Sequence, residues 1–456
     1  MTRFLPAEVI VLIDAGDTAG DLSQRRLRRV YEGAMDWLNE SVQGLLQRPP
    51  PPSYGSPFEQ DMAPVTLRQI CQGAPQVLTP PPVNGGRSPW VHLPASGKLL
   101  CFFGLSTRDG RWPQGTGDEA VRELVNLINR RLQGRPFPER GARPTLQGRV
   151  LAATPHWLAA GTQATFTDGG PAARPIPASG GRWRFDFHDD RLDRLAARPG
   201  KGDVVVAVLD TSPTLAQVRR AARRYPDNWL LQDLVGPGRE FTIDEALSVP
   251  GRLLRHLDAF VPSWRGDVRA SADGAGGSGG SGGTPAHLPS ERYLMPDHGL
   301  FSASIVRQLA PHAEIRLVRV LSDYGVGDLL ALTDVLGRLP AALNPRGDRR
   351  LVVNLSLVAG MPPSREMLSL WFPHAAEDPP TVRSLHVDMY RALDFAHRSL
   401  AETISWLTAQ GVLVVAAAGN DAGDAGVGTA PLPPEPRIPA RYEDVLAVAA
   451  VKRSSF

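Results

Sequence analysis

Three polar side chains stand where apolar segments of the C-terminal half of the chain end or begin. Asp210 closes the run DVVVAVLD, His298 precedes GLFSASIVRQL, and Asn420 follows VLVVAAAG. Near-continuous apolar runs of this kind are typical of parallel strands that are buried on both faces. Because ligands and catalytic groups gather at the carboxyl ends of such strands, we expect the three side chains to converge at one edge of a sheet.

An acid, an imidazole and an amide at one edge can transfer a proton and stabilise an oxyanion. Asp210 would orient the imidazole of His298 and stabilise its charged form. His298 would take a proton from a hydroxyl group and pass it to a leaving amine. The side-chain amide of Asn420 would donate to the oxyanion, which is worth about 10²–10³ in rate. Each residue alone also fits an ordinary role as a strand-end cap, a core or surface histidine, or a turn, but their order and contexts favour catalysis.

The elements needed to position these groups are predicted along residues 200–456. Alternating strands and helices there predict an α/β domain of three layers around a parallel sheet. The strands are expected at 203–210, 314–321, 350–357, 412–418 and 444–451, and the helices between them at 299–309, 326–339 and 387–409. A glycine-rich segment at 272–283 contains two G-x-S-x-G matches, but no strand precedes them, so no nucleophile is expected there.

Two smaller units are predicted before this domain. Residues 1–48 combine a strand at 8–16 with a helix at 22–46, which a run of prolines ends. Residues 65–165 form an α+β module with strands at 98–105 and 148–161 and an amphipathic helix at 118–132. The expected organisation is therefore a smaller α+β N-terminal region followed by the α/β domain.

Five segments of residues 203–456 resemble the subtilisin-like serine peptidases, in that family's order. VVVAVLDTS is similar to the Asp segment, and DHGLFSASIVRQLAPHAEIRLVRVL to the H-G-T-H-V-A-G segment with its following strand. VVNLSL is similar to the N-x-S-L cleft strand, VVAAAGN to the oxyanion Asn segment, and RIPARYEDVLAVAAV to Y-P-A-x-Y-x-x-V-I-x-V-x-A. The resemblance implies a parallel sheet of subtilisin type and a serine endopeptidase that forms an acyl-enzyme.

The resemblance also assigns roles to single residues. Asp210 and His298 match the acid and the base, and Asn420 matches the oxyanion donor. The cleft in which a peptide substrate adds as an edge strand would be lined by Ser356, Leu357 and Gly360. The N-terminal module, which ends in ATPHWL, fits either a propeptide that inhibits the site intramolecularly or an unrelated accessory domain.

The chain departs from the family's pattern most clearly at the nucleophile. No G-T-S-x-A-x-P segment occurs in the 456 residues; GTAP at 428–431 has Ala where Ser is needed, and Ser454 and Ser455 directly follow the last predicted strand. Leu300 and Phe301 also replace the family's Thr-His after H-G. We therefore expect a peptidase domain that is incomplete at its C-terminus, without the nucleophile segment. The alternative is a non-catalytic binding or scaffold protein on the same fold.

The amino-acid composition restricts which kinds of partner the chain can bind. The 50 basic and 47 acidic residues are nearly balanced, so no basic surface for nucleic acid is expected. Cys71 and Cys101 form neither a disulfide framework nor a zinc site, although one bridge or two free thiols both remain open. Residues 9–13 are too short for a signal-peptide core, and no run reaches the roughly 18 residues of a membrane helix. We expect a cytoplasmic protein that acts on proteins or peptides without a cofactor; structural calcium is left open.

Overall fold

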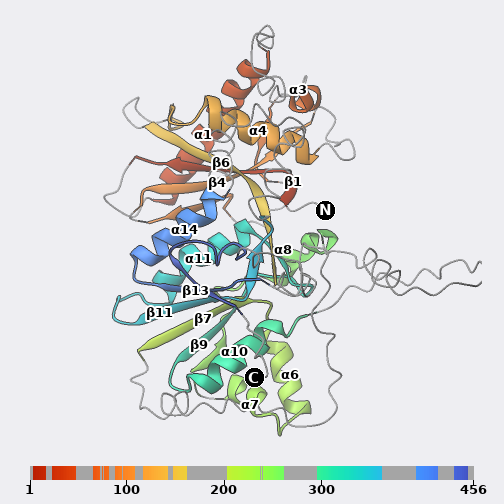
Figure 1. Cartoon of the computed structure of the whole chain (residues 1–456), viewed down its shortest axis with the longest axis vertical. Helices are drawn as coiled ribbons and strands as arrows, with labels where there is room; N and C mark the ends of the chain where they lie inside the picture. Colours follow the sequence, from red (N-terminus) through yellow and green to blue (C-terminus); the bar gives the residue numbers. More distant parts are fainter. Residues whose placement is uncertain are drawn as a thin grey trace, which may run out of the picture.

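The computed structural model describes most of the two halves of the chain. The described residues are 4–16, 23–47, 65–71, 74, 76–81, 88–94, 96–107, 117–141, 147–161, 203–236, 238, 240–260, 295–361, 397–419 and 436–449. They form two sheets, one largely antiparallel and one parallel, with helices between and outside them (Figure 1). Within these residues no helix combines the length and the apolar character needed to cross a membrane.

The N-terminal sheet is built around its first strand. β1 (Phe4–Asp14) lies between β4 (Lys98–Leu105) and β6 (Gln147–Gly161) and is antiparallel to both. The shorter strands at its margins are β2 (Leu78–Thr79), β3 (Trp90–Leu93) and β5 (Pro136–Pro138). The predicted 1–48 unit therefore supplies the central strand of a sheet whose other strands come from the predicted 65–165 module.

Helices cover both faces of this sheet, which explains why β1 is apolar without alternation. On one face lie α1 (Gln24–Gln47), α3 (Val65–Cys71) and α4 (Gly117–Arg131) (Figure 1). Two buried side chains join α1 to the strands, since Tyr31 donates to the carbonyl of Phe102 and Asn39 accepts from the backbone of Leu78. The other face of the sheet rests on helices of the C-terminal half.

The C-terminal half contains the predicted parallel sheet. Its six strands run in the order β14-β13-β11-β7-β9-β8 and all are parallel. They are β7 (Val204–Asp210), β8 (Phe241–Ile243), β9 (Glu314–Arg319), β11 (Arg350–Leu355), β13 (Leu413–Ala417) and β14 (Val445–Val448). The α/β character and the parallel sheet are confirmed, and β8 is an additional strand too short to show a periodicity.

The chain order reverses next to β7. After β7 the chain adds β8 and β9 on one side of it, and then adds β11, β13 and β14 on the other side. Such a reversal opens a crevice at the carboxyl ends of the two strands that flank it. In this sheet those strands are β7, which ends at Asp210, and β11, which ends just before Ser356.

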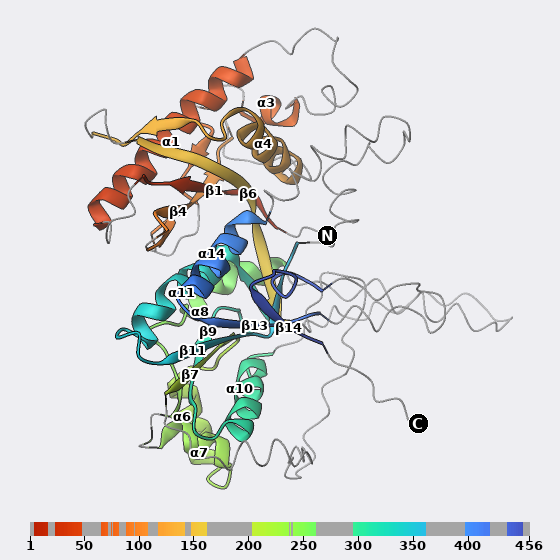
Figure 2. The same ribbon diagram turned by 60° about the vertical axis from the view of Figure 1, so that its left-hand side comes forward.

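Helices lie on both faces of the parallel sheet (Figure 2). One face carries α6 (Leu215–Arg224), α7 (Trp229–Val235) and α10 (His298–Leu309). The other carries α11 (Leu329–Leu343) and α14 (Arg398–Ala409), which are sandwiched between the two sheets. The short α8 (Gly251–Leu254) and a 3₁₀ turn (Arg255–Phe260) complete this half.

Two predicted elements differ from the structure at their boundaries. The helix expected at 326–339 begins only at Leu329, because Val326–Asp328 forms a strand, β10, and Asp328 caps the helix by accepting from the N–H of Ala331. The strand expected at 350–357 is interrupted at Ser356, and Leu357–Ala359 forms a separate strand, β12. Of the helix expected at 387–409, residues up to 396 lie outside the described part, and α14 is its final portion.

β6 connects the two halves. It is 15 residues long, and its first part pairs with β1. Its last part leaves the antiparallel sheet and pairs with β10 on one side and β12 on the other (Figure 2). The end of β6 is thereby brought to the carboxyl edge of the parallel sheet.

Candidate active site

The predicted acid and base are in contact. Asp210 is the last residue of β7 and fully buried, and His298 is the first residue of α10. The imidazole Nδ1 of His298 lies 2.9 Å from each carboxylate oxygen of Asp210. The expected hydrogen bond between these side chains is therefore present at the carboxyl edge of the parallel sheet.

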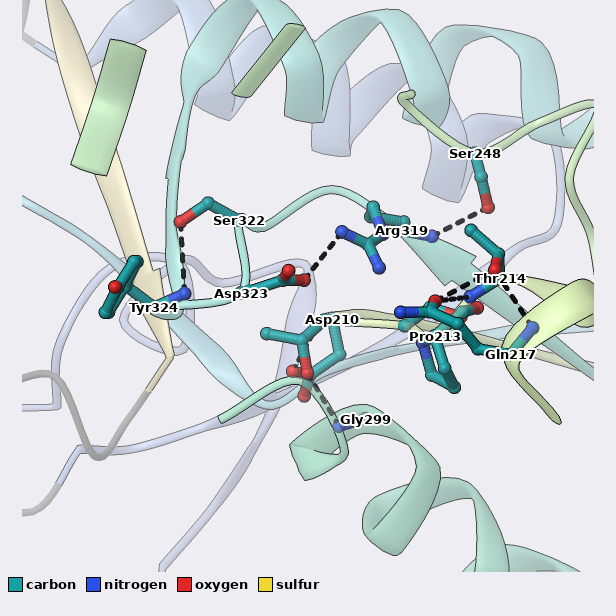
Figure 3. Close-up of polar contacts among 12 residues, drawn as sticks. Asp210, Pro213, Thr214, Gln217, Ser248, Gly299, Arg319, Ser322, Asp323 and Tyr324 are labelled. Atoms are coloured by element: carbon teal, nitrogen blue, oxygen red, sulfur yellow. Dashed lines mark hydrogen bonds and ion pairs between the residues drawn. The ribbon is translucent and has the colours of Figure 1, made fainter. Parts of the chain in front are cut away.

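Close backbone packing at Gly299 makes this contact possible (Figure 3). A Cβ atom at position 299 would lie 2.2 Å from the carbonyl oxygen of Thr211 and 2.6 Å from the Cβ of Asp210. The N–H of Gly299 donates to the hydroxyl of Thr211, over 3.2 Å. Only glycine lets α10 begin this close to the end of β7.

The carboxylate of Asp210 is fixed by its own strand end. The N–H of Thr211 donates to its Oδ1 over 2.6 Å, and the carbonyl of Asp210 accepts from the N–H of Val320. A carboxylate held in this way presents a constant geometry to the imidazole. The strand end thus orients the acid, and the acid orients the base.

The environment of His298 suits a base. Burial by itself lowers the pKa of His298, but the hydrogen bond and charge of Asp210, with a contribution from Asp297, raise it above its ordinary value. The side chain is 11% exposed. Nδ1 is held by Asp210, and within the described segments no hydrogen-bond partner is seen for Nε2. That is the arrangement that a proton-transferring imidazole requires.

The predicted cleft residues surround a strand-pairing site. Ser356 follows β11, and its hydroxyl accepts from the side-chain amide of Asn354 over 3.0 Å. Leu357, the first residue of β12, is paired with Gly161 of β6. The N–H of Gly360 donates to the carbonyl of Leu158 over 2.6 Å. Leu357 and Gly360 therefore contact the end of β6, and Ser356 directly precedes them in the chain.

Several residues of the sequence interpretation lie outside the described part. Asn420, the predicted oxyanion donor, is one, although its neighbour Gly419 is described and has a φ of 106°, a value that favours glycine. The glycine-rich segment at 272–283, GTAP at 428–431 and the two serines after β14 also lie outside it. The structure thus brings Asp210 and His298 into contact, and it places Asp210 beside the end of β11 that leads to Ser356, since Leu209 pairs with Leu355.

A chain of hydrogen bonds joins the end of β9 to the start of α10, and Figure 3 shows its first contact, between Arg319 and Asp323. Arg319, at the end of β9, donates from Nη1 to Asp323 Oδ1 over 2.8 Å. The carbonyl of Asp323 accepts from the N–H of Met295 over 2.7 Å, and the carbonyl of Met295 accepts from the N–H of His298. The turn that precedes β10 and the first residue of α10 are therefore held by one chain of hydrogen bonds.

Sequence reasoning missed a second histidine cluster. His156 of β6 is buried, with Nδ1 2.7 Å from Glu8 of β1 and Nε2 3.7 Å from Asp328. The N–H of Leu330 also points at Nε2, over 3.2 Å, so a partner faces this nitrogen in either protonation state. Burial lowers the pKa of His156, but the two carboxylates outweigh it and raise the pKa to about 9. Residues 8, 156 and 328 are too far apart in sequence for any local pattern to reveal the cluster.

The other reactive side chains do not form a site. Cys71 and Cys101 are both buried free thiols, which decides between the two possibilities left by the sequence. Burial raises the pKa of Cys71 to about 11 and that of Cys101 well above its ordinary value, so neither is activated as a nucleophile. Among the described side chains no group of three or more His, Cys, Asp or Glu residues is arranged to hold a metal.

Comparison with known proteins gives no family. Neither a model of a known protein family nor a curated protein sequence matches the chain. The function has to be argued from the geometry of Asp210, His298 and the strand-pairing site beside them.

Proposed function

We propose that this chain carries the acid, the base and the peptide-binding cleft of a serine endopeptidase of subtilisin type. The observation that carries the proposal is the 2.9 Å contact between His298 Nδ1 and the buried Asp210, beside the point where the order of the parallel strands reverses. The five sequence segments that resemble the subtilisin-like peptidases support it independently.

In the proposed reaction the Nε2 atom of His298 transfers the proton. Asp210 accepts a hydrogen bond from Nδ1–H, fixes the tautomer and stabilises the imidazolium. Nε2 takes the proton of a serine hydroxyl as the oxygen attacks the peptide carbonyl, and then gives it to the leaving amine. Asn420 donates its side-chain N–H to the oxyanion. The acyl-enzyme is hydrolysed by water, which His298 activates in the same way.

The proposed nucleophile is a serine of a G-T-S-x-A motif, and no such motif occurs among these 456 residues. In the described segments no serine hydroxyl is hydrogen-bonded to His298. The proposal needs no cofactor, because acid, base, nucleophile and oxyanion donor are all protein groups.

The end of β6 supports a protein or peptide substrate. It lies as a strand against Leu357–Ala359, where the sequence predicts that substrate pairs. A segment tethered to the same chain has a high effective concentration at such a site and can occupy it without strong intrinsic affinity. The N-terminal sheet, through β6, is accordingly proposed to inhibit the site intramolecularly.

A second function is favoured by the same pairing. A site that holds a strand, and in which no serine of the described segments is bonded to His298, also suits a non-catalytic binding or scaffold protein. The two candidates differ in a single group, the nucleophile.

A serine-directed fluorophosphonate probe separates them. We expect no labelling of the 456-residue chain. We expect stoichiometric labelling of a longer form that includes a G-T-S-x-A segment and carries Ala160→Pro, because proline removes a ladder N–H and frees the cleft of β6. His298→Ala in the longer form should abolish labelling, whereas His312→Ala, at an exposed histidine, should leave it unchanged. Labelling of the 456-residue chain at one of its own serines would contradict the assignment of the nucleophile, and an unlabelled longer form would favour the binding protein.

A further inference from the structure

Two residues near the end of β6 are paired with strands on both edges. Ala159 pairs with Gly327 of β10 on one side and with Ala359 of β12 on the other, and Ala160 pairs with Val326 and Val358. Among the described strands, β10 and β12 pair with no strand except β6. Without the end of β6, the facing edges of β10 and β12 would carry unpaired backbone groups, separated by the width of one strand.

β10 and β12 are positioned by contacts that do not involve β6. The turn before β10 is closed by the N–H of Ser322, which donates to the carbonyl of Val326 over 2.8 Å, and β10 leads directly into the capped start of α11. On the other side, the N–H of Ala359 donates to the carbonyl of Ile438 over 2.8 Å. The two strands therefore form a preformed pairing site, and β6 is its occupant.

Side chains in this pairing site have little room. Leu158, Ala159 and Ala160 are each at most 1% exposed, although consecutive residues of a strand point to opposite faces. Both faces of the occupant are thus covered. β10 is itself packed against backbone, since a Cβ atom at Gly327 would lie 2.6 Å from the carbonyl oxygen of Val320.

We propose that the pairing site is selective for extended peptides with small side chains at the positions of Ala159 and Ala160 and a leucine-sized side chain at the position of Leu158. Main-chain hydrogen bonds to β10 and β12 supply affinity for any extended segment, and the closed faces supply the selectivity. A large side chain at either alanine position would have to displace the groups that bury Ala159 and Ala160. The inference rests on the proposed function, in that the same site receives the substrate.

The test removes the end of β6 from the pairing site by mutation and then measures the binding of added peptides. Ala160→Trp places a side chain that the site cannot hold, so the end of β6 should leave it. A fluorescein-labelled peptide containing Leu-Ala-Ala-Gly should then bind, measured by fluorescence anisotropy, at least tenfold more tightly than the matched peptide containing Leu-Ala-Trp-Gly. The unaltered chain and the control Arg149→Trp, at an exposed position of the same strand, should bind neither peptide.

Ala160→Pro serves as a second opening variant, because proline removes a ladder N–H from a strand that is paired on both sides. Equal affinity for the two peptides would overturn the selectivity. No binding to either opening variant, with unchanged circular dichroism, would overturn the site itself. Where both variants fail to fold, the series Ala160→Ser, Ala160→Val and Ala160→Leu should lower Tm in order of side-chain size, and a flat series would overturn the proposal.

Failure of this inference is distinguishable from failure of the proposed function. Selective peptide binding without fluorophosphonate labelling of the longer form would support the selectivity and contradict the peptidase function. Labelling together with unselective peptide binding would support the peptidase function and contradict the selectivity.

Discussion

Two histidines lie against buried carboxylates in this molecule, and they differ in what their second ring nitrogen faces. His298 has one nitrogen on Asp210 and the other without a described partner. His156 has Glu8 on one nitrogen and Asp328 with the N–H of Leu330 on the other. An imidazole can exchange protons with a substrate only through an available nitrogen. The comparison therefore assigns chemistry to His298 and a structural role to His156.

Their positions agree with this division. His298 opens a helix at the carboxyl edge of the parallel sheet, where the order of the strands reverses. His156 lies where β1, β6 and the start of α11 meet, at the junction between the two halves of the chain. The positive charge of His156 is balanced by the carboxylates of Glu8 and Asp328. Burial raises the pKa of Asp328, but the hydrogen bond and charge of His156 lower it, and the net result is a decrease. His156 thus holds β6 to the C-terminal half two residues before the pairing site.

The largest expected effect is on catalysis. Asp210→Asn in a longer form that contains the nucleophile should lower kcat by about 10⁴, because the amide cannot hold the tautomer that His298 needs. The pKa of His298 should also fall, since Asp210 is what raises it above its ordinary value. Peptide hydrolysis and an NMR titration of the imidazole measure the two effects. Asp233→Asn, at a carboxylate paired with Arg307 away from the site, is the control. If Asp210→Asn retains full kcat, the assignment of catalysis to the pair of Asp210 and His298 is wrong.

A smaller effect is expected at His156, on stability. His156→Gln leaves the carboxylates of Glu8 and Asp328 buried without a positive charge, and breaking a buried charge cluster costs about 3–5 kcal/mol. The free energy of unfolding from urea denaturation measures this. The double variant with Glu8→Gln should recover part of the loss, because one of the uncompensated charges is removed. A cost below about 1 kcal/mol would show that the cluster is not a buried ion pair.

The smallest effect is the pH dependence of the same cluster. The pKa of His156 is raised to about 9 in the folded protein, so its proton is bound more tightly there than in the unfolded chain. The resulting stabilisation is fully present below about pH 6.5 and is lost as the pH rises through about 9, amounting to about 3 kcal/mol. Urea denaturation between pH 6 and pH 10 should show this decline. In His156→Gln it should flatten; an identical decline in that variant would assign it to other groups.

The sequence by itself determined the parts of the site whose cause is local. The apolar run before Asp210 makes a buried parallel strand that ends at this carboxylate, and the position of Asp210 at a strand end is therefore predictable from the chain itself. The parallel sheet is predictable for the same reason, since each of its longer strands is an apolar run bounded by polar residues.

Only the tertiary structure decided where the end of β6 lies and what holds it there. Val326–Asp328 continues the pattern of the helix that follows, yet in the fold it is the strand β10, which is paired with β6. Glu8, His156 and Asp328 come from three distant parts of the chain, and their charges interact only once folding has removed water from between them. Backbone pairing and buried charge depend on which segments meet, and that is a property of the assembled fold rather than of any local stretch of sequence.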